Sequence, residues 1–213
     1  MAYTTINKST DYFNTKLWTG NSGNQSITGN DFTADLTWSK TRSNAESHIL
    51  MDTVRDAGTT LNQSISSNTS NAEGTLNNSS TLTVNSTGFD LAGTSGGTLN
   101  YTGYTYATWL WKAGTTGSGT TTGAGTGKSY TYSVNTTSGF SIVAYTGNGT
   151  DGHTIPHHLG AVPKMVIYKR RSGASNWMVY HESIGATKEI SLDLTSAAST
   201  STVFNDTAPT STV

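Results

Sequence analysis

The chain has 213 residues and a formal net charge of −1, and Thr, Ser, Asn and Gly together supply 108 of its residues. Disordered chains poor in apolar residues usually carry a high net charge, whereas this chain is nearly neutral and contains five Trp, ten Tyr and five Phe. A charge this close to zero gives no electrostatic basis for nucleic-acid binding. The composition therefore predicts an ordered protein, rich in residues that favour β-strands and tight turns, with no nucleic-acid partner.

The sequence also lacks the signals of membrane insertion and of disulfide stabilisation. No apolar run approaches the roughly 20 residues that a membrane-spanning helix needs. The opening residues, MAYTTINKSTDYF, have no apolar stretch after their first lysine, and the chain has no Cys. We therefore expect no signal peptide, no membrane insertion and no disulfide.

Along the chain, short runs of alternating apolar and polar residues, and one run at 165–169 that is apolar on both faces, predict β-strands separated by polar, turn-rich pieces. A short helical turn fits residues 52–57, but no long helical period is present. The strands are predicted, in chain order, within residues 36–39, 89–91, 104–112, 130–134, 140–145 and 165–169. We expect an all-β fold, as an antiparallel β-sandwich or a jelly-roll-like arrangement.

Two stretches match each other in order, which indicates an internal repeat. Trp18-Thr-Gly-Asn returns as Tyr145-Thr-Gly-Asn, 127 residues later, and residues 36–43 return as 165–172 at an offset of 129. A two-residue insertion near Pro163 accounts for the change of offset. Because solenoid repeats are shorter, a repeat of this length favours duplicated domains.

The repeat leads to a predicted domain organisation. Residues 1–114 are predicted to form the first β-sandwich unit, and residues 128–213 a second, incomplete copy. The Gly- and Thr-rich stretch 115–127 is predicted to be a linker or exposed loop. Val84 aligns with Val213, although the first copy continues through Phe89 and the strand of Trp109 and Trp111. We hypothesise that the chain is the N-terminal portion of a longer product, or that a neighbouring chain completes the sheet.

Four segments carry a family resemblance: YFNTKLWTGN from Tyr12, YATWLWKAG from Tyr106, FSIVAYTGNGT from Phe140 and IPHHLGAVPKMVIYKRR from Ile155. Together they resemble a repeated β-module of virion and tail-fibre-type structural proteins of tailed bacteriophages, many of them marine. The resemblance implies a role on the virion surface, without distinguishing a fibre from a head decoration or another tail part. At His157-His158 the sequence departs from the His-Gly that is more frequent in that family, which puts the local turn in doubt.

His153, His157, His158 and His181 are candidates for a metal site, being four of the five histidines. No carboxylate or thiol pattern accompanies them, so a polar turn before the strand at 164–169 is the favoured interpretation. Asp151 lies in Gly-Asn-Gly-Thr-Asp-Gly, which lacks the spaced oxygen ligands and closing Glu of a calcium loop. We interpret it as part of a β-turn.

Catalysis requires a nucleophile with a base, or paired carboxylates in a defined site. The acidic residues are scattered, and neither a Gly-x-Ser-x-Gly elbow nor a phosphate-binding loop is present. We therefore predict no enzymatic activity, no catalytic or metal site and no cofactor, and we assign no ligand-binding residues.

Lys169-Arg170-Arg171 is the one basic cluster in the sequence, and it can contact anionic glycans or an acidic partner. Because Lys40 and Arg42 recur in the same register, a structural role at a strand end is favoured.

Three tryptophans, Trp109, Trp111 and Trp177, can stack on sugars. Large aromatic residues on strands are more often core residues or interface anchors, so we favour that interpretation.

The leading hypothesis is a bacteriophage virion structural protein, displayed on the particle surface and acting by assembly and surface binding without catalysis. Its expected partners are other virion proteins, further copies of the chain and host-surface glycans. It is expected to be made in the host cytoplasm and to be located in the virion. The alternatives are a lectin-like adhesin domain that binds host glycans and a polysaccharide depolymerase, which the sparse acidic residues disfavour.

Overall fold

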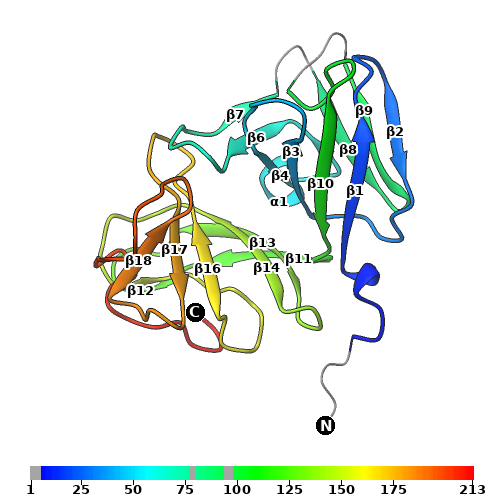
Figure 1. Cartoon of the computed structure of the whole chain (residues 1–213). Helices are drawn as coiled ribbons and strands as arrows, with labels where there is room; N and C mark the ends of the chain where they lie inside the picture. The colour runs from blue at the N-terminus through cyan, green and yellow to red at the C-terminus, as the bar shows by residue number, and fades with distance from the viewer. Residues whose placement is uncertain (1–5, 77–79, 94–97) are drawn as a thin grey trace. The chain divides into compact units, whose positions relative to one another are not determined.

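The computed structural model describes residues 6–76, 80–93 and 98–213, and its strands pair in antiparallel sheets throughout (Figure 1). This confirms the predicted all-β, antiparallel class. The chain divides into two compact units. Unit 1 comprises Met1–Ser66 and Glu73–Gly114, and unit 2 comprises Ser67–Ala72 and Thr115–Val213. In the described residues no helix has the length and apolar character needed to cross a membrane.

The described residues of unit 1 form two antiparallel sheets. The 3-10 helix η1 (Ser9–Asp11) precedes the first strand, and the short helix α1 (Thr53–Asp56) follows β4. The four-stranded sheet has the order β2 (Gln25–Thr28), β9 (Gly88–Ala92), β8 (Thr81–Asn85) and β5 (Thr60–Leu61). The six-stranded sheet has the order β1 (Phe13–Thr19), β10 (Thr105–Trp111), β3 (Leu36–Thr41), β4 (Ile49–Asp52), β6 (Gln63–Ser66) and β7 (Gly74–Thr75).

Both sheets of unit 1 contribute to one hydrophobic core. Trp18, Met51 and Leu110 enter it from the six-stranded sheet, and Leu82 and Phe89 enter it from the four-stranded sheet. The rings of Trp18 and Phe89 meet edge to face at a centroid distance of 6.1 Å. Full burial of each such side chain contributes about 1.5–3 kcal/mol. Unit 1 is therefore sandwich-like, in that two sheets share one interior.

On β3 the hydroxyl-bearing residues, and not the large apolar ones, face the core. Thr37 and Ser39 are each 1% exposed, whereas Leu36 and Trp38 are half-buried on the other face. The buried hydroxyls remain hydrogen-bonded, with Ser39 Oγ 2.9 Å from Thr108 Oγ1 of β10. The alternating pattern thus predicts the strand correctly but not its inward face, because hydroxyls that satisfy one another can be buried at little cost.

Unit 2 contains three sets of antiparallel strands. A three-stranded sheet has the order β11 (Thr115–Thr120), β13 (Ser129–Asn135) and β14 (Phe140–Tyr145). A two-stranded pair joins β12 (Thr122–Gly123) to β15 (His153–Thr154). The third set has the order β16 (Met165–Tyr168), β17 (Met178–His181), β18 (Lys188–Ser191) and β19 (Ser199–Thr200).

The stretch 115–127, expected to be a linker or loop, instead contains strands β11 and β12. β11 pairs with β13, which places Gly117 opposite Tyr132 and Gly119 opposite Tyr130. A Cβ atom on either glycine would lie only 2.6 Å from the facing tyrosine. The glycines therefore leave room for two tyrosine side chains that lie over the strand. The unit that follows Gly114 accordingly begins at Thr115, not at residue 128, and it also includes Ser67–Ala72.

Two β-hairpins at matching positions of the repeat have the same register. In β3–β4 Leu36 pairs with Asp52, and in β16–β17 Met165 pairs with His181. Each residue of the second hairpin stands 129 positions after its counterpart. Likewise, β14 begins 127 residues after β1. The repeated sequence therefore forms strands at repeated positions.

Candidate functional site

Four aromatic side chains lie on the outer face of the six-stranded sheet of unit 1, opposite the core. This aromatic row consists of Phe13 on β1, Trp38 on β3, and Trp109 and Trp111 on β10. Strand register places Phe13 opposite Trp111 and Trp109 opposite Trp38. The ring centroids of these two pairs lie 4.9 and 6.2 Å apart. Pairing of the three adjacent strands β1, β10 and β3 thus brings the four rings together.

The aromatic row is only partly covered. Phe13 is 37% exposed, and the three tryptophans are half-buried. Such rings can stack on the apolar face of a sugar or anchor a neighbouring protein surface. The third tryptophan considered for sugar stacking, Trp177, belongs to unit 2 and is 5% exposed, so it is a core residue.

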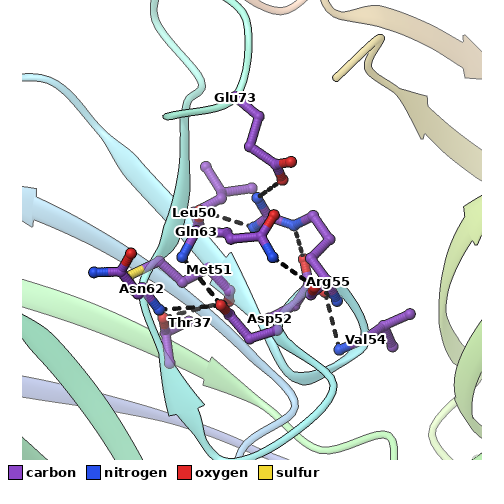
Figure 2. Close-up of polar contacts among 10 residues, drawn as sticks. Thr37, Leu50, Met51, Asp52, Val54, Arg55, Asn62, Gln63 and Glu73 are labelled. Carbon is purple, nitrogen blue, oxygen red and sulfur yellow. Dashed lines mark hydrogen bonds and ion pairs between the residues drawn. The ribbon is translucent and has the colours of Figure 1, made fainter. Parts of the chain in front are cut away.

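A second arrangement in unit 1 joins oppositely charged side chains in a buried position (Figure 2). We call Asp52, Arg55 and Glu73 the Arg55 cluster. The Arg55 guanidinium donates to Asp52 through Nε, to Glu73 Oε1 at 2.9 Å and to the Leu50 carbonyl at 2.9 Å. The three charged side chains are only 7%, 7% and 15% exposed, in the order Arg55, Asp52 and Glu73.

The local sequence explains how the Arg55 cluster forms. Asp52 is the N-cap of α1, and its Oδ1 accepts the backbone N–H groups of Val54 and Arg55 at 3.1 and 2.9 Å. An aspartate in this position satisfies amides that a helix N-terminus would otherwise leave unpaired. Burial alone lowers the pKa of Arg55, but Asp52 and Glu73 outweigh that effect and raise it. The guanidinium is therefore permanently charged and fixed in place.

A further carboxylate, Asp56, fixes the end of the same helix. It accepts the backbone N–H groups of Asn62 and Gln63, each at 3.2 Å. Burial raises the pKa of Asp56, while the two backbone amides oppose that shift.

The chemistry of the Arg55 cluster is structural. Its carboxylates are occupied by a guanidinium and by backbone amides, so they are poorly placed to act as a general acid and base pair. The cluster instead connects α1 to the chain before β7, and it stabilises the β4–β6 connection.

The four histidines considered as metal ligands do not come together. In the described chain, no three His, Asp or Glu side chains gather where they could hold a metal ion. Each histidine has a local polar partner: Asn148 for His153, Thr210 for His157, Tyr130 for His158 and Ser183 for His181. Asp151 lies in a turn, as the sequence predicts.

His158 stands where the resembling phage proteins more often have glycine, and its backbone has the conformation that glycine favours. Its φ of 60° is in the left-handed region, which glycine adopts without strain. The imidazole stacks on Tyr132 at a centroid distance of 3.7 Å, and its Nε2 lies 3.0 Å from Tyr130 Oη. Burial lowers the pKa of His158, with a smaller effect from His157. The ring contacts of His158 therefore offset the cost of its left-handed backbone.

The basic cluster of unit 2 is held through its first residue. Lys169 Nζ donates to the carbonyls of Ser70 and Ser175, and it lies 5.9 Å from the centroid of the Trp177 ring. Lys40, its counterpart in the repeat, also donates to carbonyls, those of Thr41 and Asn44. The geometry fits the structural role favoured from the sequence.

Sequence reasoning missed the Arg55 cluster altogether. Its one local signal is the spacing of Asp52 and Arg55, three residues apart, which suits a capped helix start. Glu73 lies 18 residues after Arg55, and no pattern in the sequence identifies it as the second partner.

Comparison with known proteins identifies the family. The model of DUF7483, described as a domain of unknown function, matches residues 8–213 and so extends over both units. No curated protein and no solved structure matches the chain. Because the family match covers nearly the whole sequence, the chain belongs to the DUF7483 family.

Proposed function

We propose that this protein is a bacteriophage virion structural protein, displayed on the particle surface as part of a tail fibre or a head decoration. It acts by assembly and surface binding, without bond-making chemistry. Its partners are other virion proteins and further copies of the chain. The observation that carries the proposal is that the segments resembling phage structural proteins are scaffold elements, because they include β1, β10, β14 and β16.

The same proposal includes a finer architecture: a β-sandwich of jelly-roll-like type, duplicated, with the second copy incomplete. The shared core of the two sheets in unit 1 supports the sandwich. The common register of β3–β4 and β16–β17 supports the duplication.

Mass spectrometry of washed phage particles tests the function. The expected result is a fixed copy number of this chain per particle, together with binding of an antibody against the folded protein to intact particles. A protein that is abundant in the infected-cell lysate but missing from washed particles would overturn the proposal.

A lectin-like adhesin domain is a second candidate, favoured by the partly exposed aromatic row. A glycan array with the purified chain tests it, and Phe13→Ala should lower binding at least tenfold. Tyr101→Ala is the matched control, because Tyr101 and Phe13 are each 37% exposed and Tyr101 lies outside the row. Equal loss in both variants, or no selective binding, would count against this candidate.

A further inference from the structure

In unit 1, β10 fills the position between β1 and β3. It pairs antiparallel with both strands. Its Thr108 links the two neighbours, because the Thr108 hydroxyl accepts a hydrogen bond from Trp18 Nε1 at 3.2 Å and lies 2.9 Å from Ser39 Oγ. β1 and β3 therefore belong to one sheet only because β10 lies between them.

In unit 2, the counterparts of these two neighbours have no strand between them. β14 corresponds to β1, and β16 corresponds to β3. In the described chain β14 pairs with β13 alone, and β16 pairs with β17 alone. Each of the two strands therefore has one edge without a strand partner.

The open edge of β14 is the one that corresponds to the β10 side of β1. In an antiparallel pair, alternate residues direct their N–H and C=O groups to the partner strand. In unit 1 the Tyr12 carbonyl accepts from the backbone N–H of Lys112, so the backbone polar groups of the even-numbered residues of β1 point toward β10. In unit 2 the backbone N–H of Thr146 donates to the Ser129 carbonyl. The backbone N–H and C=O groups of Ser141, Val143 and Tyr145 therefore point away from β13. Those three correspond to residues 14, 16 and 18.

The same reasoning applies to β16. The backbone N–H of Arg42 donates to the Thr105 carbonyl, so the backbone polar groups of the even-numbered residues of β3 point toward β10. The backbone N–H of Glu182 donates to the Lys164 carbonyl, so the backbone polar groups of Met165 and Ile167 on β16 point away from β17. These two correspond to residues 36 and 38. Both open edges are thus the β10-type edges.

Side-chain packing leads to the same conclusion. The rings of Tyr145 and Tyr168, which correspond to Trp18 and Ser39, lie 6.2 Å apart. The side chains that correspond to the two neighbours of Thr108 in unit 1 therefore meet each other in unit 2. None of the six residues of β14 is buried, and Met165 and Ile167 on β16 are 56% and 40% exposed.

We propose that unit 2 is a strand acceptor, in which the open edges of β14 and β16 together bind one β-strand supplied by a protein of different sequence. The bound strand runs antiparallel to both neighbours, as β10 does in unit 1. Alternate residues of the bound strand then hydrogen-bond to β14 and to β16. The inference stands on strand pairing and does not depend on the proposed place in a virion.

The side chains around the gap define the chemistry of the incoming strand. Its outward residues should be large and apolar, because Met165 and Ile167 take the places of Leu36 and Trp38 beside Trp109 and Trp111. The residue at the position of Thr108 should be small, because two tyrosine rings lie there instead of Trp18 and Ser39.

A fluorescently labelled peptide with the sequence of residues 104–112, extended by lysines for solubility, tests the proposal on the whole chain. We expect saturable binding at one peptide per chain, measured by fluorescence anisotropy. Hydrogen exchange should slow in both β14 and β16. A peptide with proline at the positions of Thr108 and Trp109 loses one N–H toward each neighbouring strand and should bind at least tenfold more weakly.

Matched variants of the protein locate the binding site. Ile167→Lys should weaken peptide binding at least tenfold, and Leu17→Lys should not, although Leu17 is also an exposed residue of an edge strand. Absence of binding, protection of only one strand, or a greater effect of Leu17→Lys would overturn the proposal. Protection of both strands by self-association of the chain without peptide would show that a second copy fills the gap, which would contradict a different polypeptide as the partner.

Discussion

The hairpins β3–β4 and β16–β17 share a register but differ in their surroundings. In unit 1, Thr37 and Ser39 are 1% exposed, and their strand β3 pairs with β10 in the same sheet. Their counterparts, Val166 and Tyr168, are more apolar in sequence but only half-buried. Hairpin register is thus encoded locally, through side-chain alternation and turn length, whereas burial depends on the strands and the sheet that surround the hairpin.

The residues after the two hairpins also differ. Asp52 and Arg55 form the buried Arg55 cluster in unit 1, while the matching positions of unit 2 hold His181 and Ile184. The ion pair in the corresponding region of unit 2, between Lys164 and Glu182, is exposed. The repeat therefore preserves the strands but not the way in which the following turn is fixed.

The largest expected effect comes from breaking the Arg55 cluster. Arg55→Ala leaves two buried carboxylates without a cation, and breaking a buried pair costs about 3–5 kcal/mol. Urea unfolding followed by tryptophan fluorescence measures this. Lys164→Ala is the control and should change stability little, because an exposed pair is largely solvated. Similar losses in the two variants would contradict the structural role of the cluster.

Truncating one pair of matching positions, Trp18 in unit 1 and Tyr145 in unit 2, tests the difference in burial. Trp18→Ala should cost about 3–5 kcal/mol, since the indole is buried against Tyr106 and Phe89. Tyr145→Ala should cost less than half as much, because Tyr145 is only half-buried beside the open edge. Equal free-energy changes in denaturant titrations would show that unit 2 is as fully packed as unit 1.

The glycines of β11 provide a smaller test. Gly119→Ala places a Cβ against the buried Tyr130 ring, and overpacking of this kind costs about 1–3 kcal/mol. Gly147→Ala is the control, because a Cβ there has no neighbour within 4 Å. Thermal unfolding of both variants should separate them, and an unchanged melting temperature for Gly119→Ala would contradict the close approach of the tyrosine.

His158 offers a comparison at a single position. His158→Ala retains the left-handed backbone and loses the stacking on Tyr132, whereas His158→Gly loses the stacking but removes the strain. The glycine variant should therefore be more stable than the alanine variant, by about 1 kcal/mol. The reverse order in chemical denaturation would mean that the turn is not strained.

The smallest effect is a pH dependence that arises from the same imidazole. Because the pKa of His158 is lowered in the folded chain, the unfolded chain takes up its proton first on acidification. The contribution to stability is present above the ordinary pKa of 6.5 and is lost as the pH falls through the lowered folded-state pKa. His158→Gly should lose stability less steeply than the wild type between roughly pH 7 and pH 5. Parallel curves of melting temperature against pH for His158→Gly and the wild type would show that His158 is not the source of the pH dependence.

The sequence predicts strands where large side chains alternate with polar ones or follow one another in a short apolar run. This holds for β10, β13, β14 and β16, and the helical turn near residue 53 is also present as α1. β11 is not predicted, because Gly and Thr residues give little indication of which face of a strand is buried. The strand forms by pairing with β13, whose tyrosines lie opposite its glycines.

The candidate sites are harder to predict than the strands. The aromatic row depends on register, since Phe13 and Trp111 are 98 residues apart in sequence and meet only because β1 pairs with β10. For the Arg55 cluster, the sequence contains other carboxylates as suitable as Glu73, and only the fold decides which one is buried. Long-range pairing is the information that single-residue patterns lack.

The assignment of Ser67–Ala72 to unit 2 determines how the chain can be dissected for expression. The backbone carbonyl of Ser70 accepts both the Ser175 amide, at 2.8 Å, and the Lys169 ammonium. A fragment that starts at Thr115 would lose this acceptor and leave Lys169 without one of its partners. Separate production of unit 2 should therefore improve when a synthetic hexapeptide of residues 67–72 is supplied in trans or fused ahead of Thr115.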